Sequence, residues 1–212
     1  MAIDVIYADD AIVVLNKPSG LLSVPGRGDD KQDCLSSRVQ TQYPDALIVH
    51  RLDMATSGLL VMARGATVQR QLSEAFASRQ VHKSYEAVVA GLLAPTPPQG
   101  QLIALAIAVD WPNRPLRVID PVHGKPSQTR LHLLQSNPAT CSSRVGLEPV
   151  TGRSHQLRVH MQAIGHPIWG DALYAPPSVA NMAARLLLHA RTLSFQHPGT
   201  GVTVAFDCPC EF

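Results

Sequence analysis

The chain has 212 residues, which is long enough to bury a core as one large domain or two small ones. Apolar residues make up 45% and charged residues 16%, which excludes a disordered chain, and no run approaches the roughly 18 apolar residues of a transmembrane helix. The acidic N-terminus lacks the basic region of a secretory signal, and four cysteines without a CxxC pair exclude a disulfide scaffold, so we expect a cytoplasmic protein with reduced thiols.

The net charge of +2 conceals an uneven distribution of basic residues. Of the 18 basic side chains, 14 are arginines, which grip phosphate with a planar fork and stack on bases, although a GC-rich genome also raises the arginine content. Residues 1–50 hold four basic and seven acidic side chains, whereas residues 112–171 hold seven basic and three acidic ones. The second half of the chain is therefore predicted to present one side to a polyanion.

The first half of the chain predicts short strands and two helices. In chain order we expect strands over 4–10 and 11–17, a loop over 21–33, a helix over 34–43 ended by Pro44, a buried strand over 57–64, a helix over 67–80 and a strand over 82–91. The helix over 67–80 places Val68, Leu72 and Phe76 on one face, which is the pattern of an amphipathic helix against a core.

The second half predicts mostly strands. After a proline-rich excursion over 92–101, we expect strands over 101–107, 116–120, 128–135 and 140–150, a helix over 154–165, a short helix over 178–185, and strands over 185–195 and 201–207. Many strands with a few interspersed helices predict an α+β fold with a mixed, largely antiparallel sheet.

Several kinds of chemistry have no signal in the sequence. There is no GxGxxG after a strand and no Walker motif, so no nucleotide cofactor is expected. His155 and His160 are five apart, which turns them away from each other on a helix, and Cys208 with Cys210 makes half a metal site at most. Ser57 lies in TSG and not in GxSxG, which argues against a hydrolase nucleophile.

The segment HRLDMATSG (50–58) gathers polar side chains directly before an apolar strand. Asp53 lies between Leu52 and Met54, and a carboxylate with apolar neighbours is expected to be partly buried and to need a partner. An alternative is that Asp53 caps the turn before the strand or pairs with Arg51.

The segment TGRSHQLRVH (151–160) supplies cationic partners at the start of a predicted helix. Ser154 is predicted to cap this helix, and the helix start, with Arg153 at its entry, favours anions. An inward-facing Arg158 beside Asp53 would hold the pKa of that carboxyl below its usual range. The alternative is that Arg153 and Arg158 are ordinary surface residues.

The segment HKSYEAVVAG (82–91) carries Tyr85 on a predicted strand, where Tyr85, Ala87 and Val89 alternate on one face. A tyrosine in this position is commonly a packing residue at the core or its rim.

Taken in order, these three segments resemble the RluA family of pseudouridine synthases. The likeness extends over roughly residues 10–206 and rests on HRLDMATSGLLVMAR, HKSYEAVVAG, PVTGRSHQLRVHMQAIGHPIWGDALYA, RLLLHA and the opening NKPSGLLSVPG. The resemblance implies the pseudouridine synthase fold, with a bent mixed sheet flanked by helices and loops around a central RNA-binding cleft. It also implies a single catalytic domain over 1–212, without the separate N-terminal RNA-binding domain of longer relatives.

The resemblance implies a reaction and the residues that carry it. Uridine in RNA is isomerised to pseudouridine without cofactor, metal or energy source, and the catalytic residues of the family fall on Asp53, Tyr85 and Arg158. The residues expected to bind RNA are Arg51, Arg153, His155, Lys83, Arg114 and Lys125. The expected partner is a loop of ribosomal or transfer RNA, with no membrane, no obligatory protein partner and a monomeric state.

The reaction breaks the bond from uracil nitrogen to the anomeric carbon, rotates the base and forms a carbon–carbon bond. A glycosidase places a second carboxylate across the bond and admits water, whereas only one carboxylate is signalled here. Asp53 must be ionised, either to attack the sugar or to remove a sugar proton, and the sequence leaves both open. Tyr85 is expected to pack on the uracil and to help remove the proton at carbon five. The target must also leave its stack, which a single-stranded loop makes less costly.

Two departures from the family pattern concern substrate choice. Met54 and Ala55 replace a charged pair common after the aspartate, and SVPGR (23–27) and DWPNRP (110–115) resemble a short member that acts on both large-subunit ribosomal RNA and transfer RNA. Two other classes of function stay open at this point: a non-catalytic RNA-binding or ribosome-assembly protein, and a glycosylase that releases uracil.

Overall fold

The predicted α+β class with a mixed, largely antiparallel sheet is confirmed by the computed structural model, which describes residues 3–212. The backbone divides into two compact units, of which the first takes in the chain up to Lys83 and His189–Glu211 and the second takes in Ser84–Leu188 and Phe212. The chain passes from one unit to the other within strands β5 (His82–Ala90) and β11 (Leu188–Gln196).

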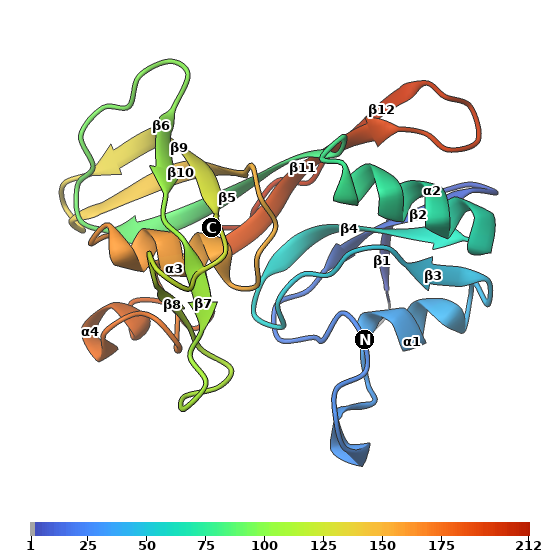
Figure 1. The fold of residues 1–212 in the computed structure, drawn as a ribbon, viewed down its shortest axis with the longest axis horizontal. Coiled ribbons are helices and arrows are strands. Elements are labelled where there is room, and N and C mark those ends of the chain that lie inside the picture. The colour runs from blue at the N-terminus through green and yellow to red at the C-terminus, as the bar shows by residue number, and fades with distance from the viewer. Residues whose placement is uncertain (1–2) are drawn as a thin grey trace. The chain divides into compact units, whose positions relative to one another are not determined.

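The first unit is a mixed sheet with short helices (Figure 1). Besides β11 its elements are β1 (Asp4–Ala8), β2 (Ile12–Lys17), a 3-10 helix (Asp29–Lys31), α1 (Leu35–Gln40), β3 (Ala46–Ile48), β4 (Ser57–Arg64), α2 (Ala66–Ala77) and β12 (Thr203–Asp207). Its strand pairs are antiparallel except for β4 and β11, which run parallel at Ser57↔His189. At Gly58 the φ angle is +106° and a Cβ atom would lie 2.4 Å from the carbonyl oxygen of Ala190, so only glycine fits this pairing.

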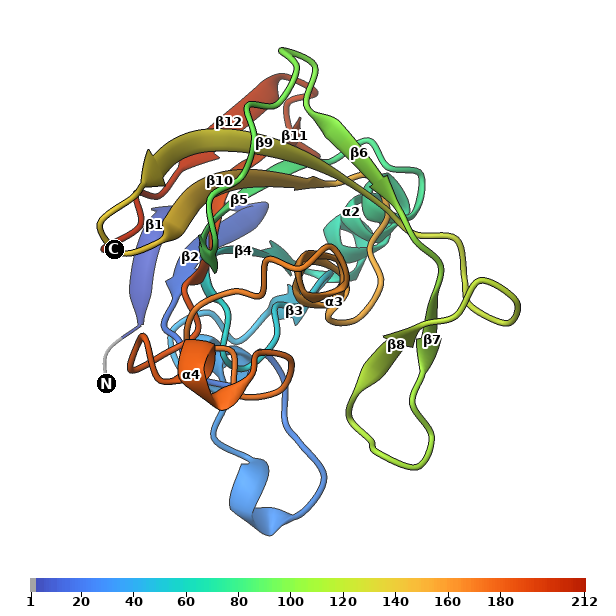
Figure 2. The same ribbon diagram turned by 90° about the vertical axis from the view of Figure 1, so that its left-hand side faces the viewer.

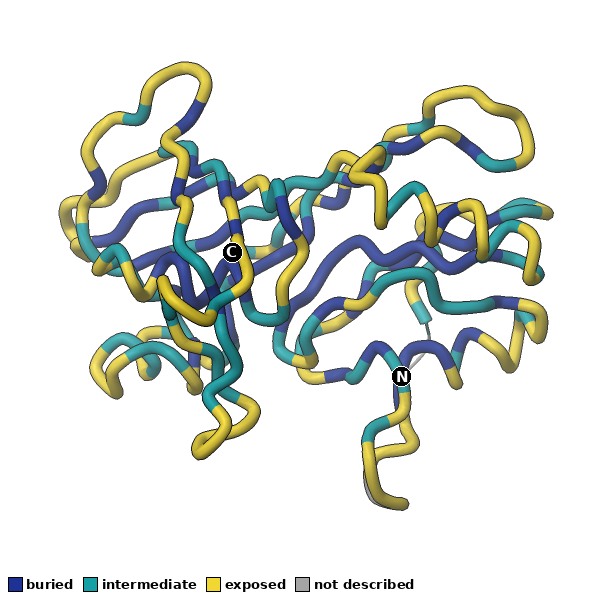
Figure 3. The backbone as a smooth tube through the Cα atoms, in the orientation of Figure 1, coloured by how far each residue is buried: buried dark blue, intermediate teal, exposed yellow. Residues whose placement is uncertain are grey.

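The core of the first unit lies on both faces of β2 and β4. Figure 1 shows α2 on one side of these strands and α1 on the other. Both strands are buried except at Asn16 and Arg64, which are half-buried, and the dark blue of β4 in Figure 3 shows this burial. Leu72 of α2 is buried, with Val68 and Phe76 beside it, as the predicted helix face requires. Burial on two faces explains why β4 reads as a continuous apolar run and not as an alternating one.

The second unit is an antiparallel sheet with one helix packed on it. Its strands pair in the order β5–β10–β9–β6, and a separate hairpin forms from β7 and β8 (Figure 2). Besides β5 the elements are β6 (Gln101–Ala104), β7 (Ile107–Val109), β8 (Arg117–Ile119), β9 (Gln128–Asn137), β10 (Ser142–Pro149), α3 (Gln156–Ala163) and α4 (Pro177–Ala180). Helix α3 contacts β8, β9 and β10.

Some predicted elements have different boundaries in the structure. The strand expected over 101–107 is broken into β6 and β7, because the carbonyl of Leu105 accepts a hydrogen bond from His160 Nε2 at 3.0 Å and not from a strand partner. The helix expected over 178–185 ends at Ala180. Three-residue β3, which pairs only with the end of β4, was not predicted.

The predicted capping of α3 by Ser154 is wrong. His155 occupies the N-cap position with a left-handed φ of 58°, and the helix has no side-chain cap among the described residues. No helix in the described part of the chain is long and apolar enough to cross a membrane.

Candidate active site

Asp53 lies half-buried in a loop that hydrogen bonds fix on both sides. The Asp53 carbonyl accepts from the amide of Thr56 at 3.1 Å and closes a turn directly before β4. Ser23 bonds the backbone of buried Leu52 twice, with its hydroxyl donating to the carbonyl at 2.7 Å and accepting from the amide at 3.1 Å. On the other side the hydroxyl of Ser19 donates to the carbonyl of Ala55 at 2.7 Å. The backbone around Asp53 is therefore set by the segment that follows β2.

Lys17, the last residue of β2, is fully buried beneath this loop. Its ammonium donates to the carbonyls of Pro18 at 2.8 Å, Leu21 at 2.7 Å and Met54 at 3.0 Å. Burial lowers the pKa of Lys17 to about 8, and the nearby negative charge of Asp53 acts in the opposite direction. The burial of this residue was not predictable from the sequence, because lysine is normally exposed.

His50 anchors the start of the same loop to β4. Its Nε2 accepts from the backbone amide of Val61 at 3.1 Å, and its ring stacks on Phe76 with centroids 4.4 Å apart. Burial, aided by the positive charge of Lys83, lowers the pKa of His50 to about 3. His50 is thus neutral at physiological pH and holds the proton on Nδ1. Lys83, predicted to bind RNA, has its ammonium 5.4 Å from the centre of the Phe76 ring.

Arg158 is buried in the second unit, which excludes the interpretation that it is a surface residue. It binds the carboxylate of Asp171 with two hydrogen bonds, from Nε at 2.8 Å and from Nη2 at 2.6 Å. Asp171 also accepts from the amides of Leu173 and Tyr174 at 3.0 and 3.2 Å, and the guanidinium carbon lies 5.0 Å from the centre of the Tyr174 ring. Asp171 and Tyr174 were not selected from the sequence, although both belong to the GDALY stretch of the third motif.

The turn before α3 is held by the buried side chain of Gln156. Its amide oxygen accepts from the Thr151 hydroxyl at 2.7 Å and from the Arg153 amide at 3.1 Å, while its nitrogen donates to the carbonyl of Gln128 at 2.8 Å. The hydroxyl of Tyr174 accepts from the amide of Arg117 at 2.9 Å and is also hydrogen-bonded to Nδ1 of His155 at 2.6 Å. Arg153 is exposed at this turn, as an RNA contact requires.

Tyr85 lies near the start of β5, opposite Leu147 of β10. It shares a strand face with Ala87 and Val89, which are buried, whereas Tyr85 itself is only half-buried. The ring therefore stands at the rim of the core.

Three further predicted RNA contacts are exposed. Arg51 follows His50 in the Asp53 loop, and Lys125 lies beside β7, paired through its backbone with Ile107. Arg114 lies in the loop of the β7–β8 hairpin, with its guanidinium 3.6 Å above the ring of Trp111. Trp111 is 68% exposed, so the pair presents a planar cation and an aromatic face to solvent.

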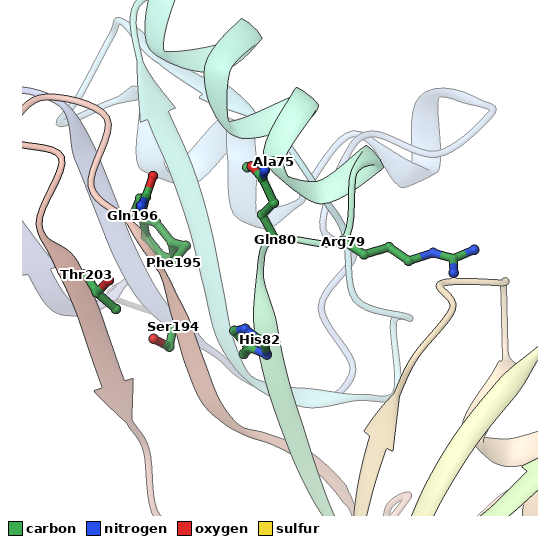
Figure 4. A pocket seen from close by; sticks show the side chains of 8 residues that line it. All are labelled: Ala75, Arg79, Gln80, His82, Ser194, Phe195, Gln196 and Thr203. Carbon is green, nitrogen blue, oxygen red and sulfur yellow. The ribbon is translucent and has the colours of Figure 1, made fainter.

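The first unit also contains an open cavity of about 480 Å³ that is separate from the Asp53 loop (Figure 4). Its lining residues come from the end of α2, the start of β5, and β11 and β12: Ala75, Arg79, Gln80, His82, Ser194, Phe195, Gln196 and Thr203. Figure 4 shows Arg79 extending away from the other labelled side chains. None of the predicted site residues lines this cavity.

The model of the RNA pseudouridylate synthase family matches residues 11–163, a stretch that holds the Asp53 loop, Tyr85 and Arg158, and the chain belongs to this family. It is 49% identical over 208 residues to the Dual-specificity RNA pseudouridine synthase RluA of Escherichia coli K12, with 98% of this chain and 93% of the relative covered. The enzyme of the same name from Yersinia pestis is also 49% identical, with 98% and 99% covered. The expected membership of the RluA family is confirmed.

Solved structures agree with this assignment. Human RNA Pseudouridylate Synthase Domain Containing 1 superposes with a TM-score of 0.81 at 30% identity, covering 99% of this chain and 84% of the human one. Human RNA Pseudouridylate Synthase Domain Containing 4, at 24% identity and a TM-score of 0.76 over 97% and 88%, supports the fold alone. The chain is an RNA pseudouridine synthase, an isomerase that converts uridine in RNA to pseudouridine, and a non-catalytic RNA-binding role is not favoured.

Proposed function

We propose that this enzyme modifies uridines in both large-subunit ribosomal RNA and transfer RNA, and that Asp53, Tyr85 and Arg158 carry the reaction. The observation that most supports the substrate range is the 49% identity, over nearly the whole length of both chains, to enzymes named for dual specificity. On this proposal the two units work as one catalytic domain, without metal or cofactor, in a monomeric cytoplasmic protein.

Asp53 acts on the sugar of the flipped uridine, either by attacking the anomeric carbon or by removing a sugar proton. Both routes require the ionised carboxylate at a defined position, because a displacement of about 1 Å can cost a hundredfold in rate. The hydrogen bonds that fix Leu52, Met54 and Ala55 support this role, since they hold the backbone on both sides of Asp53.

Arg158 supplies a fixed positive charge for the reaction. Its bidentate bond to Asp171 fixes the orientation of the guanidinium, as a charge acting at a reacting group requires. Tyr85 packs on the uracil from the rim of its unit and assists loss of the proton at carbon five. Its unperturbed pKa near 10 makes it a weak base, so the surroundings of the bound uridine must help.

The RNA around the flipped nucleotide is bound by basic side chains, of which Arg51, Arg114, Lys125 and Arg153 are exposed and Lys83 and His155 are half-buried. Their contacts go to phosphates, whereas Trp111 beside Arg114 offers a ring on which a base can stack. Single-stranded loops are favoured because their bases leave the stack at lower cost.

The substrate range is tested by mapping pseudouridines in RNA from cells that lack the gene, using carbodiimide modification and reverse-transcription stops. We expect the loss of sites in both large-subunit ribosomal RNA and transfer RNA, restored by the wild-type gene. Loss in one RNA class alone would restrict the enzyme to that class. Purified enzyme acting on a synthetic stem-loop separates isomerisation from base excision, because excision would release free uracil.

A further inference from the structure

We propose that the cavity at the end of α2 (Figure 4) is a second RNA-binding site, which holds the sugar and phosphate of one unpaired nucleotide in addition to the reacting uridine. The cavity lies within the first unit, and none of the basic residues assigned above to the RNA around the flipped nucleotide lines it. The inference uses RNA as the substrate, and it does not depend on the catalytic roles of Asp53, Tyr85 and Arg158.

The lining of the cavity is polar and carries no negative charge. Two of the lining residues are apolar, Ala75 and Phe195, and no aspartate or glutamate is among the described residues that line it. The polar ones provide a guanidinium, an imidazole, two amides and two hydroxyls: Arg79, His82, Gln80, Gln196, Ser194 and Thr203. Such a lining favours a ligand that is anionic and rich in hydroxyl groups.

The polar side chains of the lining have no partners in the protein. None of the six makes a side-chain hydrogen bond or an ion pair with the described part of the chain. Polar side chains close by in the sequence are paired, since the hydroxyl of Ser78 donates to the carbonyl of Glu74 at 2.7 Å and Arg191 binds Asp207 at 2.6 Å. Unused donors and acceptors around one cavity are the groups that fix the orientation of a ligand.

The two walls of the cavity are fixed by backbone pairing. On one wall, the amide of Gln80 donates to the carbonyl of Ala75 at 2.9 Å and joins the last turn of α2 to the start of β5. On the other wall, which Figure 4 shows across from Gln80, Gln196 and Thr203 face each other in the β11–β12 pair. A site on paired strands and a helix end is already formed before the ligand binds, which lowers the entropic cost of binding.

The size and shape of the cavity favour one nucleotide of a strand. Its volume of about 480 Å³ lies in the range of small-ligand sites, roughly 300–1,000 Å³. Because it is open, a nucleotide can enter while its neighbours in the strand stay outside. The ring of Phe195 is buried and offers no face for a base to stack on, so the ligand is held through its ribose hydroxyls and phosphate.

The last turn of α2 contacts both the cavity and the loop of Asp53. The ring of Phe76 stacks on His50 at the start of that loop, with centroids 4.4 Å apart, and the preceding residue, Ala75, lines the cavity. Arg79 is exposed directly after α2, and Figure 4 shows its side chain extending away from the others. An RNA strand that leaves the reacting uridine can therefore pass around the end of α2, with Arg79 at the rim to bind a phosphate.

The test adds one negative charge inside the cavity and one outside it. Gln196→Glu is compared with Gln71→Glu, an exposed position in α2 that does not line the cavity. On a synthetic stem-loop with single-stranded flanks, we expect Gln196→Glu to raise KM about tenfold at unchanged kcat, because a carboxylate repels the phosphate. Gln71→Glu should change neither constant.

Thr203→Asp repeats the test from the second strand of this wall, and it decides the question if Gln196→Glu does not fold. Circular dichroism checks the fold of each variant. We expect the same increase in KM for Thr203→Asp. A KM within twofold of the parent in the folded cavity variants would overturn the proposal.

Titration with uridine 5′-monophosphate distinguishes a nucleotide of the RNA from a free one. The side-chain amide signals of Gln80 and Gln196 in NMR spectra of the enzyme should shift with the stem-loop and with the mononucleotide. Uridine, which lacks the phosphate, should shift them only at higher concentration. Saturable binding of the mononucleotide, together with unchanged KM values of the cavity variants, would assign the cavity to a free nucleotide and overturn its role in RNA binding. Full activity of Asp53→Asn would overturn the proposed catalytic role and leave this inference intact.

Discussion

Arg158 binds Asp171 through two hydrogen bonds of 2.8 and 2.6 Å, and neither side chain is accessible to more than a few per cent. A buried ion pair gives little net stability relative to an apolar pair, but the loss of one partner leaves a charge without compensation. The pair therefore fixes the orientation of the guanidinium. Removal of either partner is expected to lower the free energy of unfolding strongly.

Asp171→Asn is expected to lower the free energy of unfolding by about 3–5 kcal/mol, because Arg158 stays buried without a carboxylate. Urea denaturation followed by circular dichroism measures the change. Asp207→Asn is the matched control, since it breaks an exposed pair with Arg191 and should cost less than about 1 kcal/mol. Similar decreases in the free energy of unfolding of both variants would show that burial of the Arg158–Asp171 pair does not increase the cost of breaking it.

His50 is expected to make the protein sensitive to acid. Its pKa is about 3 in the folded protein and near 6.5 when unfolded, so between these values only the unfolded chain takes up the proton. Stability therefore falls as the pH falls through this window, by about 2 kcal/mol between pH 7 and pH 5. His50→Gln, whose amide oxygen can still accept from Val61, should lose about 2 kcal/mol less over the same range. An equal loss in parent and variant would show that His50 titrates normally.

Arg79→Gly is expected to raise the free energy of unfolding by about 0.5–1 kcal/mol, since Arg79 follows α2 with a φ of 62°, where glycine is favoured. Arg70→Gly, in the interior of α2, removes the same charge and should lower it by about 1 kcal/mol. Thermal melts of the two variants should therefore shift in opposite directions. A decrease for Arg79→Gly would mean that the arginine side chain stabilises the fold by contacts that outweigh the backbone strain.

The helix and strand types were largely predictable from the sequence because they follow from local periodicity. The continuous apolar run of β4 and the spacing of Leu72 and Phe76 in α2 are signals of this kind. The break at Leu105 was not predictable, since it depends on a bond to His160, which is 55 residues away.

The chemistry of the site was predictable only where a motif carried it. Asp53, Tyr85 and Arg158 were selected on segments that the family match contains, but their catalytic roles stay proposals. Lys17 was missed because a lysine at the end of a strand is normally exposed, and its burial depends on three carbonyls brought together by folding. The left-handed backbone of His155 was missed because a serine one residue earlier is the commoner cap.

Arg114→Ala tests the predicted contact of the β7–β8 hairpin with RNA. If Arg114 binds one phosphate of a single-stranded loop, the slope of log affinity against log salt should decrease by about 0.7. Arg70→Ala, which removes an exposed charge from α2, should leave the slope unchanged. Equal slopes for the parent and Arg114→Ala would exclude a phosphate contact by this residue.

The central claim, that the carboxylate of Asp53 performs the reaction, is tested most directly by Asp53→Asn. The asparagine keeps the size of the side chain and removes its charge, so the variant should bind a synthetic transfer RNA stem-loop within about threefold of the parent. Pseudouridine formation, measured by nucleoside chromatography after digestion of the RNA, should be undetectable in single-turnover reactions. Formation of pseudouridine by Asp53→Asn at the rate of the parent enzyme would contradict the account.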